Sequence, residues 1–509
     1  MTHYNLLIVG AGAAGCILAR RLSELCPDAS IGLVEAGPDG RVSPFINSDL
    51  PSVFQTWSPT SNWQLKTCPQ SGLKNRSVDI TQGKVLGGGT SVNAMMYVRG
   101  DFTVIDEWYV RSGFNPNWSP TCFRQAFQSI ESFHTDHLSP LRGSSGPLSI
   151  RETPHPSQSS RAFLQAIAER GYQIADFNGE SQRDIGGFMQ LNIDLDGNRC
   201  STAQAFLRDP LPSNLSLELN TEVASLAMNG NCCQGVHTAD GRHISADHTI
   251  LSAGAFLSPA ILMLSGIGDP NLLKECNIDC QVASPNVGLN LSDHMRAMVA
   301  YQSNQPPGTT EFLCEAALFT SSGYRDTPEP DIQINFSAGV DGFIPTEFLD
   351  GDLHQQTVIF VPVLARPSGR GSIKPVGPTF KDGLRIDPGY LTNPIDIKTY
   401  TTAVDIVRDL ARTDALAPYC QKELCPGSLD VEDYLRTHAQ TIWHPVGTCA
   451  MGATPEESVV DPTFKVFGVD NLSVVDASVL PSLPSGNPQA SIFAMASIAA
   501  DIIQSTIRS

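Results

Sequence analysis

The first forty residues alternate between strand-like and helix-like patterns of apolar side chains. Residues 6–9 form a continuous apolar run, residues 16–22 carry apolar side chains at helical spacing, and residues 31–34 form a second apolar run. Continuous apolar runs of this length are typical of strands that are buried on both faces. The pattern therefore predicts a strand, a helix and a second, parallel strand, which is the opening unit of an α/β fold.

The pattern changes several times further along the chain. Residues 41–82, rich in Pro, Ser, Asn and Trp, predict an extended excursion rather than regular elements. Between about residues 300 and 430, alternating polar and apolar positions indicate an antiparallel sheet accompanied by helices. The other predicted elements are strands at 215–219, 249–252, 331–336, 358–361 and 472–475, a helix at 400–412 and a final helix from about 489 to 507.

A glycine motif joins the first strand to the first helix. Gly10, Gly12 and Gly15 have the GxGxxG spacing, and Glu35 ends the second apolar run twenty residues after the last of them. Glycines there allow a tight turn and a close approach to a pyrophosphate, which lies at the helix N-terminus. Glu35 suits ribose hydroxyls and repels a 2′-phosphate. The strand, helix and acid around the motif predict a bound dinucleotide.

The α/β patterns at both ends of the chain predict a discontinuous domain organisation. We expect a Rossmann-like, nucleotide-binding domain from residues 1–150, 198–295 and 435–509. A substrate-binding domain, built on an antiparallel sheet with helices, is expected from residues 151–197 and 296–434. The fold class is α/β, or α+β when both domains are counted. A chain of 509 residues is long enough for about two or three such domains.

Composition narrows the classes of partner that the protein is expected to bind. The formal net charge is −19, with 33 basic and 52 acidic residues, which argues against nucleic acid and anionic membrane surfaces. No apolar run approaches the roughly 18 residues of a membrane span. The thirteen cysteines are scattered without a C-x-x-C pair, so we expect free thiols and no metal site. The first strand begins almost at once, so we expect a cytoplasmic protein, or a secreted one only if a signal was trimmed.

Two further glycine-containing stretches stand out. Three consecutive glycines at 87–89 remove every Cβ from a loop, so its amides can press against a flat ligand or an anion; the alternative is a flexible turn. Residues 254–268 predict a packing helix, in which Pro259 suits an early position and Ser265 with Gly266 suits the end. This helix alone indicates no chemistry.

Three polar residues near the C-terminus are candidates for a site. His444 precedes a Pro-Val-Gly bend, Asp476 follows a predicted strand and Asn487 lies at the start of the final helix. Taken singly, each has a structural interpretation: a core or surface histidine, a turn-forming acid and a helix cap. Their significance depends on the motifs that accompany them.

Taken together, these features resemble the glucose–methanol–choline (GMC) oxidoreductase family over essentially the whole chain. Residues 83–100 and 254–268 are similar to its two diagnostic stretches, and residues 285–294 are similar to a further family segment. His444 and Asn487 follow these stretches in the same order along the chain as the corresponding residues of the family. The resemblance implies FAD as the dinucleotide.

The resemblance also implies roles for the polar residues. His444 is expected to be the base that takes the hydroxyl proton of an alcohol, while hydride passes to flavin N5. Asn487 is expected to orient the substrate oxygen by hydrogen bonding. Asn93 is expected near the reactive edge of the flavin, and the helix N-terminus at Pro488 and Gln489 is expected to steady negative charge on its pyrimidine end. The full set of expected cofactor-binding residues is Gly10, Gly12, Ala14, Gly15, Glu35, Ala36, Gly88, Gly89, Asn93, Ala94, Met96, Val223, Asp476, Ala477, Pro488 and Gln489.

Two positions refine this prediction. Members that attach FAD covalently carry His where this chain has Val92, so we predict non-covalent FAD. Trp443, next to His444, resembles the aryl-alcohol and hydroxymethylfurfural oxidase branch, where an aromatic neighbour packs against a flat substrate; Trp443 could equally be a wall residue. The expected substrate is a small primary alcohol, with aromatic and furanic alcohols as the narrower prediction.

Several alternatives stay open at this point. The reoxidant is O2 or another acceptor, so oxidase and dehydrogenase are both consistent with the sequence, as are choline-like and glycoside alcohols. GMC-type folds also support lyase chemistry and photodecarboxylation, and a non-catalytic flavoprotein is a further option. A quaternary ammonium substrate would require an aromatic box with a carboxylate, and the sequence identifies none. The oligomeric state is not predicted.

Overall fold

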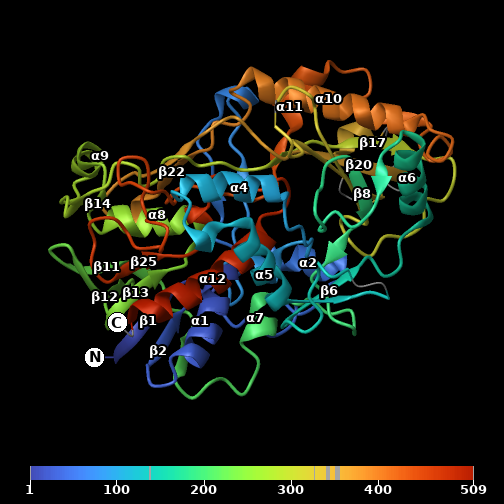
Figure 1. Cartoon of the computed structure of the whole chain (residues 1–509). Coiled ribbons are helices and arrows are strands. Elements are labelled where there is room, and N and C mark those ends of the chain that lie inside the picture. Colours follow the sequence, from blue (N-terminus) through green and yellow to red (C-terminus); the bar gives the residue numbers. More distant parts are fainter. Residues whose placement is uncertain (1, 137–138, 326, 340–343, 350–355, 508–509) are drawn as a thin grey trace.

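A seven-stranded sheet forms the first half of the fold, seen at the lower left of Figure 1. The computed structural model describes residues 2–136, 139–325, 327–339, 344–349 and 356–507. The strand order is β10 (Leu215–Glu218), β2 (Ile31–Val34), β1 (Thr2–Val9), β13 (His243–Leu251), β12 (Cys232–Thr238) and β11 (Val223–Asn229), with β25 (Leu472–Val474) also beside β13. β10, β2, β1, β13 and β25 are parallel, whereas β11 and β12 are antiparallel additions. The parallel strands predicted at 6–9, 31–34, 215–219, 249–252 and 472–475 therefore share one sheet.

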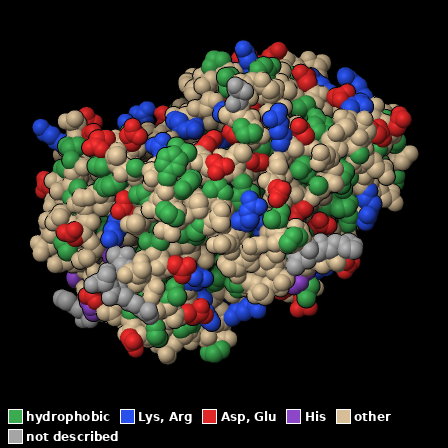
Figure 2. Space-filling view, viewed as in Figure 1, with side chains coloured by type: hydrophobic (Ala, Val, Ile, Leu, Met, Phe, Trp, Pro, Cys, Tyr) green, Lys and Arg blue, Asp and Glu red, His purple; other side chains and the backbone are tan. Residues whose placement is uncertain are grey.

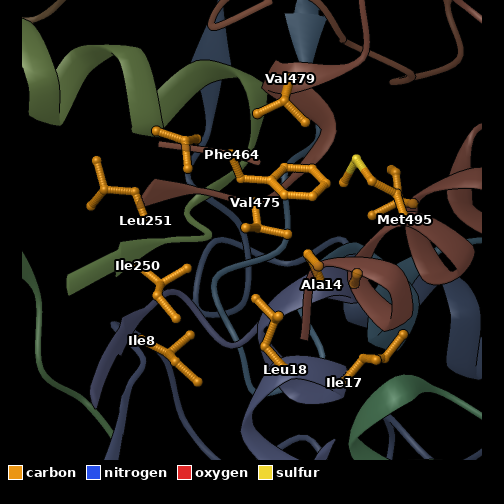
Figure 3. Packing of buried hydrophobic residues seen from close by; sticks show 14 of the residues in the cluster. Ile8, Ala14, Ile17, Leu18, Ile250, Leu251, Phe464, Val475, Val479 and Met495 are labelled. Atoms are coloured by element: carbon orange, nitrogen blue, oxygen red, sulfur yellow. The ribbon is translucent and has the colours of Figure 1, made fainter. Parts of the chain in front are cut away.

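Two helices from opposite ends of the chain lie side by side on this sheet. α1 (Ala13–Leu25) and α12 (Gln489–Ile507) pack together. In Figure 3, Ala14 and Leu18 of α1 lie between the strand residues Ile8 and Ile250 on one side and Met495 of α12 on the other. These side chains are buried, so the apolar faces of strands and helices form one core. The final helix follows the predicted bounds.

A nine-stranded sheet forms the second half, at the upper right of Figure 1. All its pairings are antiparallel except that of β7 with β8, which confirms the predicted antiparallel insert. Helices α6 (Gln158–Glu169) and α10 (Pro394–Ala411) pack on it, and α11 (Val431–His438) packs on α10. The strands are β23 (Lys422–Cys425), β17 (Val299–Gln302), β20 (Thr357–Leu364), β19 (Ile332–Ala338), β18 (Ala316–Thr320), β8 (Ile185–Phe188), β7 (Gln173–Ile174), β16 (Met295–Arg296) and β24 (Gln440–Thr441).

Near the expected domain boundaries, the sheets include strands from both sides of a boundary. β24 joins the nine-stranded sheet although it lies inside the span 435–509, which we assigned to the nucleotide-binding domain. β6 (Leu148–Glu152) runs across the boundary at 150 and belongs to a separate three-stranded sheet with β5 (Glu131–His134) and β9 (Gln190–Leu191). The boundaries at 150, 197, 295 and 434 stay predictions.

Residues 41–82 contain more regular structure than their composition predicts. α2 (Leu50–Thr56) forms there because Asp49 accepts a hydrogen bond from the Ser52 amide and Pro51 suits the first turn. Two short strands, β3 (Leu65–Lys66) and β4 (Asp79–Ile80), follow it.

The shorter helices and strands in the rest of the chain are α3 (Gly89–Val92), α4 (Phe102–Arg111), α5 (Pro120–Ile130), α7 (Thr202–Phe206), β14 (Ile267–Gly268), α9 (Pro270–Glu275), β15 (Val282–Ala283), β21 (Ser372–Pro375) and β22 (Leu384–Asp387).

The predicted packing helix is α8 (Gly254–Leu264), and its proline lies deeper than expected. Pro259 stands inside the helix rather than in its first turn, so the carbonyl of Ala255 has no amide partner at this position. The Thr448 hydroxyl donates to that carbonyl at 2.5 Å, which satisfies it. The end of the helix is as predicted, since Ser265 caps it and Gly266 follows with φ +80°.

On the face of the molecule that Figure 2 shows, no patch of a single charge stands out. Figure 2 shows acidic and basic side chains interspersed over the visible face. Within the part of the chain that the structure describes, no helix is long and apolar enough to cross a membrane. All thirteen cysteines lie in that part, and each is a free thiol.

Candidate active site

One cavity is lined by residues from both sheets. It begins at the turn between β1 and α1, passes the glycine loop at 87–89 and ends against β16, β19 and β20, where Arg296, Asn335 and Val361 line it. The cavity brings together all but one of the residues expected at the site. These are Gly10, Gly12, Ala14, Glu35, Ala36, Gly88, Gly89, Asn93, Ala94, Met96, Val223, Trp443, His444, Asp476, Ala477, Asn487, Pro488 and Gln489.

Gly15 does not line the cavity and has a packing role instead. A Cβ on Gly15 would lie 1.9 Å from the carbonyl oxygen of Gly10, so only glycine lets α1 approach the end of β1. The role of Gly15 as a cofactor-binding residue stays a prediction, and the structure adds a packing role. It holds the N-terminus of α1 where the other glycines can line the cavity.

The glycine loops form a cradle at one end of the cavity. Gly10 has φ +97°, and a Cβ on Gly88 would lie 2.7 Å from Cα of Gly12, so the two loops touch backbone to backbone. Gly12 is the N-cap of α1 and has no side chain to bond the amides of the first turn. A helix N-terminus without a capping side chain that borders a cavity fits a pyrophosphate.

Glu35 lies at the end of β2 and is held by backbone amides. Its Oε2 accepts from the Ala11 amide and its Oε1 accepts from the Gly37 amide, both at 2.9 Å. Burial raises the pKa of Glu35 to about 7, while the two amides and Lys84 oppose that shift. Because each carboxyl oxygen has a second lone pair, the side chain can still accept from ribose hydroxyls.

A series of side-chain hydrogen bonds, here called the hydrogen-bonded chain, connects the glycine loop to the final helix, α12. Asn93 Nδ2 donates to Gln489 Oε1 at 2.7 Å, and Gln489 Nε2 donates to the Met96 carbonyl and, at 3.0 Å, to Asn192 Oδ1. This chain fixes the N-terminus of α12 beside the loop. Asn192 was not expected from sequence, because it lies 297 residues from Gln489, its partner at the start of α12.

Four polar side chains meet beside the cavity, and two of them, His444 and Asn487, line it. His444 Nδ1 lies 3.0 Å from His294 Nδ1, and Asn487 Nδ2 lies 3.3 Å from His444 Nε2. Asn487 Oδ1 accepts from Gln333 Nε2 at 3.4 Å, which orients the amide with Nδ2 toward the histidine. The structure thus brings His444 and Asn487 together, and adds His294 and Gln333 to them.

The hydrogen bonds determine the tautomer of His444. His294 Nε2 lies 2.8 Å from the Ala365 carbonyl, which only accepts, so this nitrogen carries the proton. The Nδ1 of a neutral His294 must then accept, and His444 Nδ1 must donate to it. His444 Nε2 is left unprotonated: its lone pair accepts from Asn487 Nδ2 at 3.3 Å and borders the cavity, where a general base is required.

Burial keeps both histidines neutral. The pKa of His444 lies well below 6.5 because burial disfavours the charged ring and a positive His294 would repel it. Burial likewise lowers the pKa of His294 to about 4, with a smaller contribution from Arg366. The neutral forms that the tautomer argument requires are therefore the favoured ones.

A buried carboxylate holds the backbone at His444. Asp293 Oδ1 accepts from the His444 amide at 2.7 Å, and Asp293 Oδ2 accepts from the hydroxyls of Tyr390 and Thr441, each at 2.5 Å. Asp293 and His294 end the segment 285–294, whose resemblance to the family was the one sequence signal for them. Tyr390 and Thr441 carry no such signal.

Two tryptophans form an aromatic wall beside the histidine. Trp443 has φ +61°, a left-handed conformation that is rare for a bulky residue, and its amide donates to Thr441 Oγ1 at 2.7 Å. Its ring meets Trp57 edge to face at 5.2 Å, and Trp57 Nε1 donates to the Val92 carbonyl at 2.8 Å. The hydrogen bond from Trp57 to Val92 therefore connects the aromatic wall to the segment that follows the glycines at 87–89.

Comparison with known proteins identifies the family. The GMC oxidoreductase sequence models match residues 4–296 and 367–496. The chain belongs to the GMC oxidoreductase family. It is therefore an FAD-dependent oxidoreductase that acts on CH–OH donors, as the resemblance implied.

The relatives of this GMC oxidoreductase extend over its whole length. It is 33% identical to an alcohol dehydrogenase [acceptor] of Pseudomonas putida, covering 98% of this chain and 95% of the relative. It is 34% identical to the mitochondrial choline dehydrogenase of Homo sapiens, covering 99% and 90%. A solved pyridoxine 4-oxidase from Mesorbium loti superposes with a TM-score of 0.89 at 29% identity, covering 98% of each chain.

Proposed function

We propose that His444 is the base of an alcohol oxidation and that Asn487 positions the substrate oxygen. The observation that carries this proposal is the arrangement of His444 Nε2 and Asn487 Nδ2, a lone pair and a donor 3.3 Å apart at the wall of one cavity. A hydroxyl oxygen in the cavity, within hydrogen-bonding distance of both atoms, donates its proton to Nε2 while it accepts from the amide. FAD, when bound, supplies the acceptor for the hydride that leaves the carbinol carbon.

The proton then stays on His444 and its charge is shared with its surroundings. Protonated Nε2 makes the ring a cation, whose Nδ1–H still donates to His294. Asp293 lies against the His444 amide and partly compensates that charge.

The pH dependence of flavin reduction tests the role of His444. Only the neutral ring accepts a proton, and its pKa lies well below 6.5. The neutral form therefore already dominates at pH 6.5, and the rate should fall only at a lower pH. Anaerobic stopped-flow reduction over a pH series measures this; an acid limb with its midpoint at or above 6.5 would contradict the assignment.

We propose a primary alcohol with a flat, aromatic or furanic body as the substrate. The aromatic wall of Trp57 and Trp443 supports a flat body, because aromatic rings pack favourably against one another. The described lining from the nine-stranded sheet includes Arg296 and no carboxylate, which disfavours the quaternary ammonium of choline. Anaerobic reduction rates with benzyl alcohol, furfuryl alcohol, pyridoxine and choline test this preference.

We propose that FAD is bound without a covalent link. Val92 lines the cavity with an unreactive side chain, and the described lining contains no Cys or Tyr and no His besides His444. Acid precipitation of the protein should therefore release all of the flavin into the supernatant. A yellow pellet after washing would show that the link is covalent.

The acceptor that reoxidises FAD is proposed as O2 or a second small molecule. The relatives support both, since one is named an alcohol dehydrogenase [acceptor] and another a pyridoxine 4-oxidase. No observation favours lyase chemistry, photodecarboxylation or a non-catalytic flavoprotein over alcohol oxidation, because both polar groups that the oxidation requires face the cavity.

A further inference from the structure

Arg199 is a buried arginine directly behind the glycine loop. It lies just before α7, with 1% of its surface exposed. Its Nη1 donates to the Thr90 carbonyl at 3.2 Å and to Asn93 Oδ1 at 2.9 Å. Thr90 and Asn93 both line the cavity, so one residue separates the guanidinium from the dinucleotide site.

The rest of this guanidinium has no protein partner among the described residues. Nε and Nη2 are buried without a hydrogen bond, and no described carboxylate forms an ion pair with Arg199. Burial lowers the pKa of Arg199 to about 9, and no nearby charge opposes that shift. Arg99 and Arg142, which are equally buried, both bind Glu131 instead. A buried cation without a counter-charge is unfavourable, so its presence requires an explanation.

The surroundings of Arg199 point toward the anionic parts of a dinucleotide. The Thr202 amide donates to Thr90 Oγ1 at 3.1 Å, and Thr202 Oγ1 reaches the carbonyl of Gly12, the N-cap of α1, at 3.5 Å. On the other side, Asn93 leads to Gln489 at the N-terminus of α12. Arg199 therefore stands between the two helix N-termini that border the cavity.

We propose that bound FAD supplies the negative charge that Arg199 lacks, which makes Arg199 a positioning residue that couples cofactor binding to the loop at 87–93. Two parts of FAD can supply negative charge: the pyrophosphate, which is always anionic, and the ring system, which gains negative charge on reduction. The proposal rests on FAD as the cofactor and not on the identity of the alcohol. It is therefore tested without turnover.

The experiment compares Arg199→Met, which removes the charge, with Arg199→Lys, which keeps it. Met should weaken FAD retention on ultrafiltration by about 10-fold or more, or make the two-electron reduction potential of the holoenzyme more negative. Weaker retention at an unchanged potential assigns the pyrophosphate, and a lower potential with unchanged retention assigns the ring. Lys should recover most of either effect.

Thermal unfolding with and without FAD separates this role from simple packing. Because Met removes an uncompensated buried charge, the FAD-free chain should unfold at an equal or higher temperature, while the increment given by FAD shrinks. Arg208→Met, at an exposed arginine that follows α7, is the matched control and should change neither quantity. If Met prevents folding, Arg199→Gln, which keeps one donor for the loop, takes its place. Unchanged retention and potential, with equal destabilisation of both forms, would overturn the proposal.

Discussion

Replacing His444 with alanine should slow anaerobic flavin reduction by about 100-fold or more, which corresponds to about 2.7 kcal/mol of transition-state stabilisation. The reason is that His444 is the only histidine in the described lining of the cavity, and its unprotonated Nε2 lies beside Asn487. Stopped-flow absorbance at the flavin band measures the rate directly. The variant must first show the absorbance spectrum of bound flavin, so that loss of cofactor is not mistaken for loss of the base.

A histidine away from the site provides the control for this experiment. His237 is exposed on β12, and its replacement by alanine should leave the reduction rate unchanged. The expected difference between the two variants is therefore specific to the cavity. Reduction of the His444→Ala variant at the wild-type rate would remove His444 from the mechanism.

Replacing His294 with leucine should slow reduction by about 10- to 100-fold. Leucine cannot accept from His444 Nδ1, so a buried N–H loses its partner, and the tautomer with a protonated Nε2 becomes populated. That tautomer cannot take the substrate proton. Because His294 acts through His444, substrate affinity should change little while the limiting reduction rate falls, and stopped-flow titration with alcohol separates the two.

Asparagine at the same position distinguishes the tautomer effect from a packing effect. His294→Asn also loses the hydrogen bond to the Ala365 carbonyl, but its Oδ1 can accept from His444 Nδ1. The asparagine variant should therefore retain most of the rate that leucine loses. Equal losses in both variants would mean that His294 serves the fold and does not select the tautomer.

Local patterns in the sequence predicted the nucleotide-binding half of the fold well. The runs at 6–9 and 31–34 and the GxGxxG spacing between them specify β1, α1 and β2, because strand burial, helical spacing and glycine turns are properties of adjacent residues. The end of α8 at Ser265 and Gly266 was predictable for the same reason. The start of that helix was not, since Pro259 is tolerated only through the distant Thr448 hydroxyl.

The candidate site was predictable only where the family motifs mark it. His444 and Asn487 were found through their order along the chain, whereas His294, Asp293 and Gln333 received no role. Their roles depend on contacts between residues more than a hundred positions apart, such as the 3.0 Å approach of His294 and His444. Arg199 was missed for a related reason: an arginine in a sequence carries no sign that it will be buried without a carboxylate.

The central claim, that this GMC oxidoreductase removes a proton and a hydride from an alcohol at one cavity, is tested most directly by anaerobic stopped-flow absorbance. The purified yellow protein is mixed with benzyl alcohol, furfuryl alcohol, pyridoxine or choline, and air is then admitted. We expect the aromatic and furanic alcohols to bleach the flavin, with fast recovery in air indicating an oxidase and slow recovery a dehydrogenase. Absence of bleaching with every alcohol would contradict the claim.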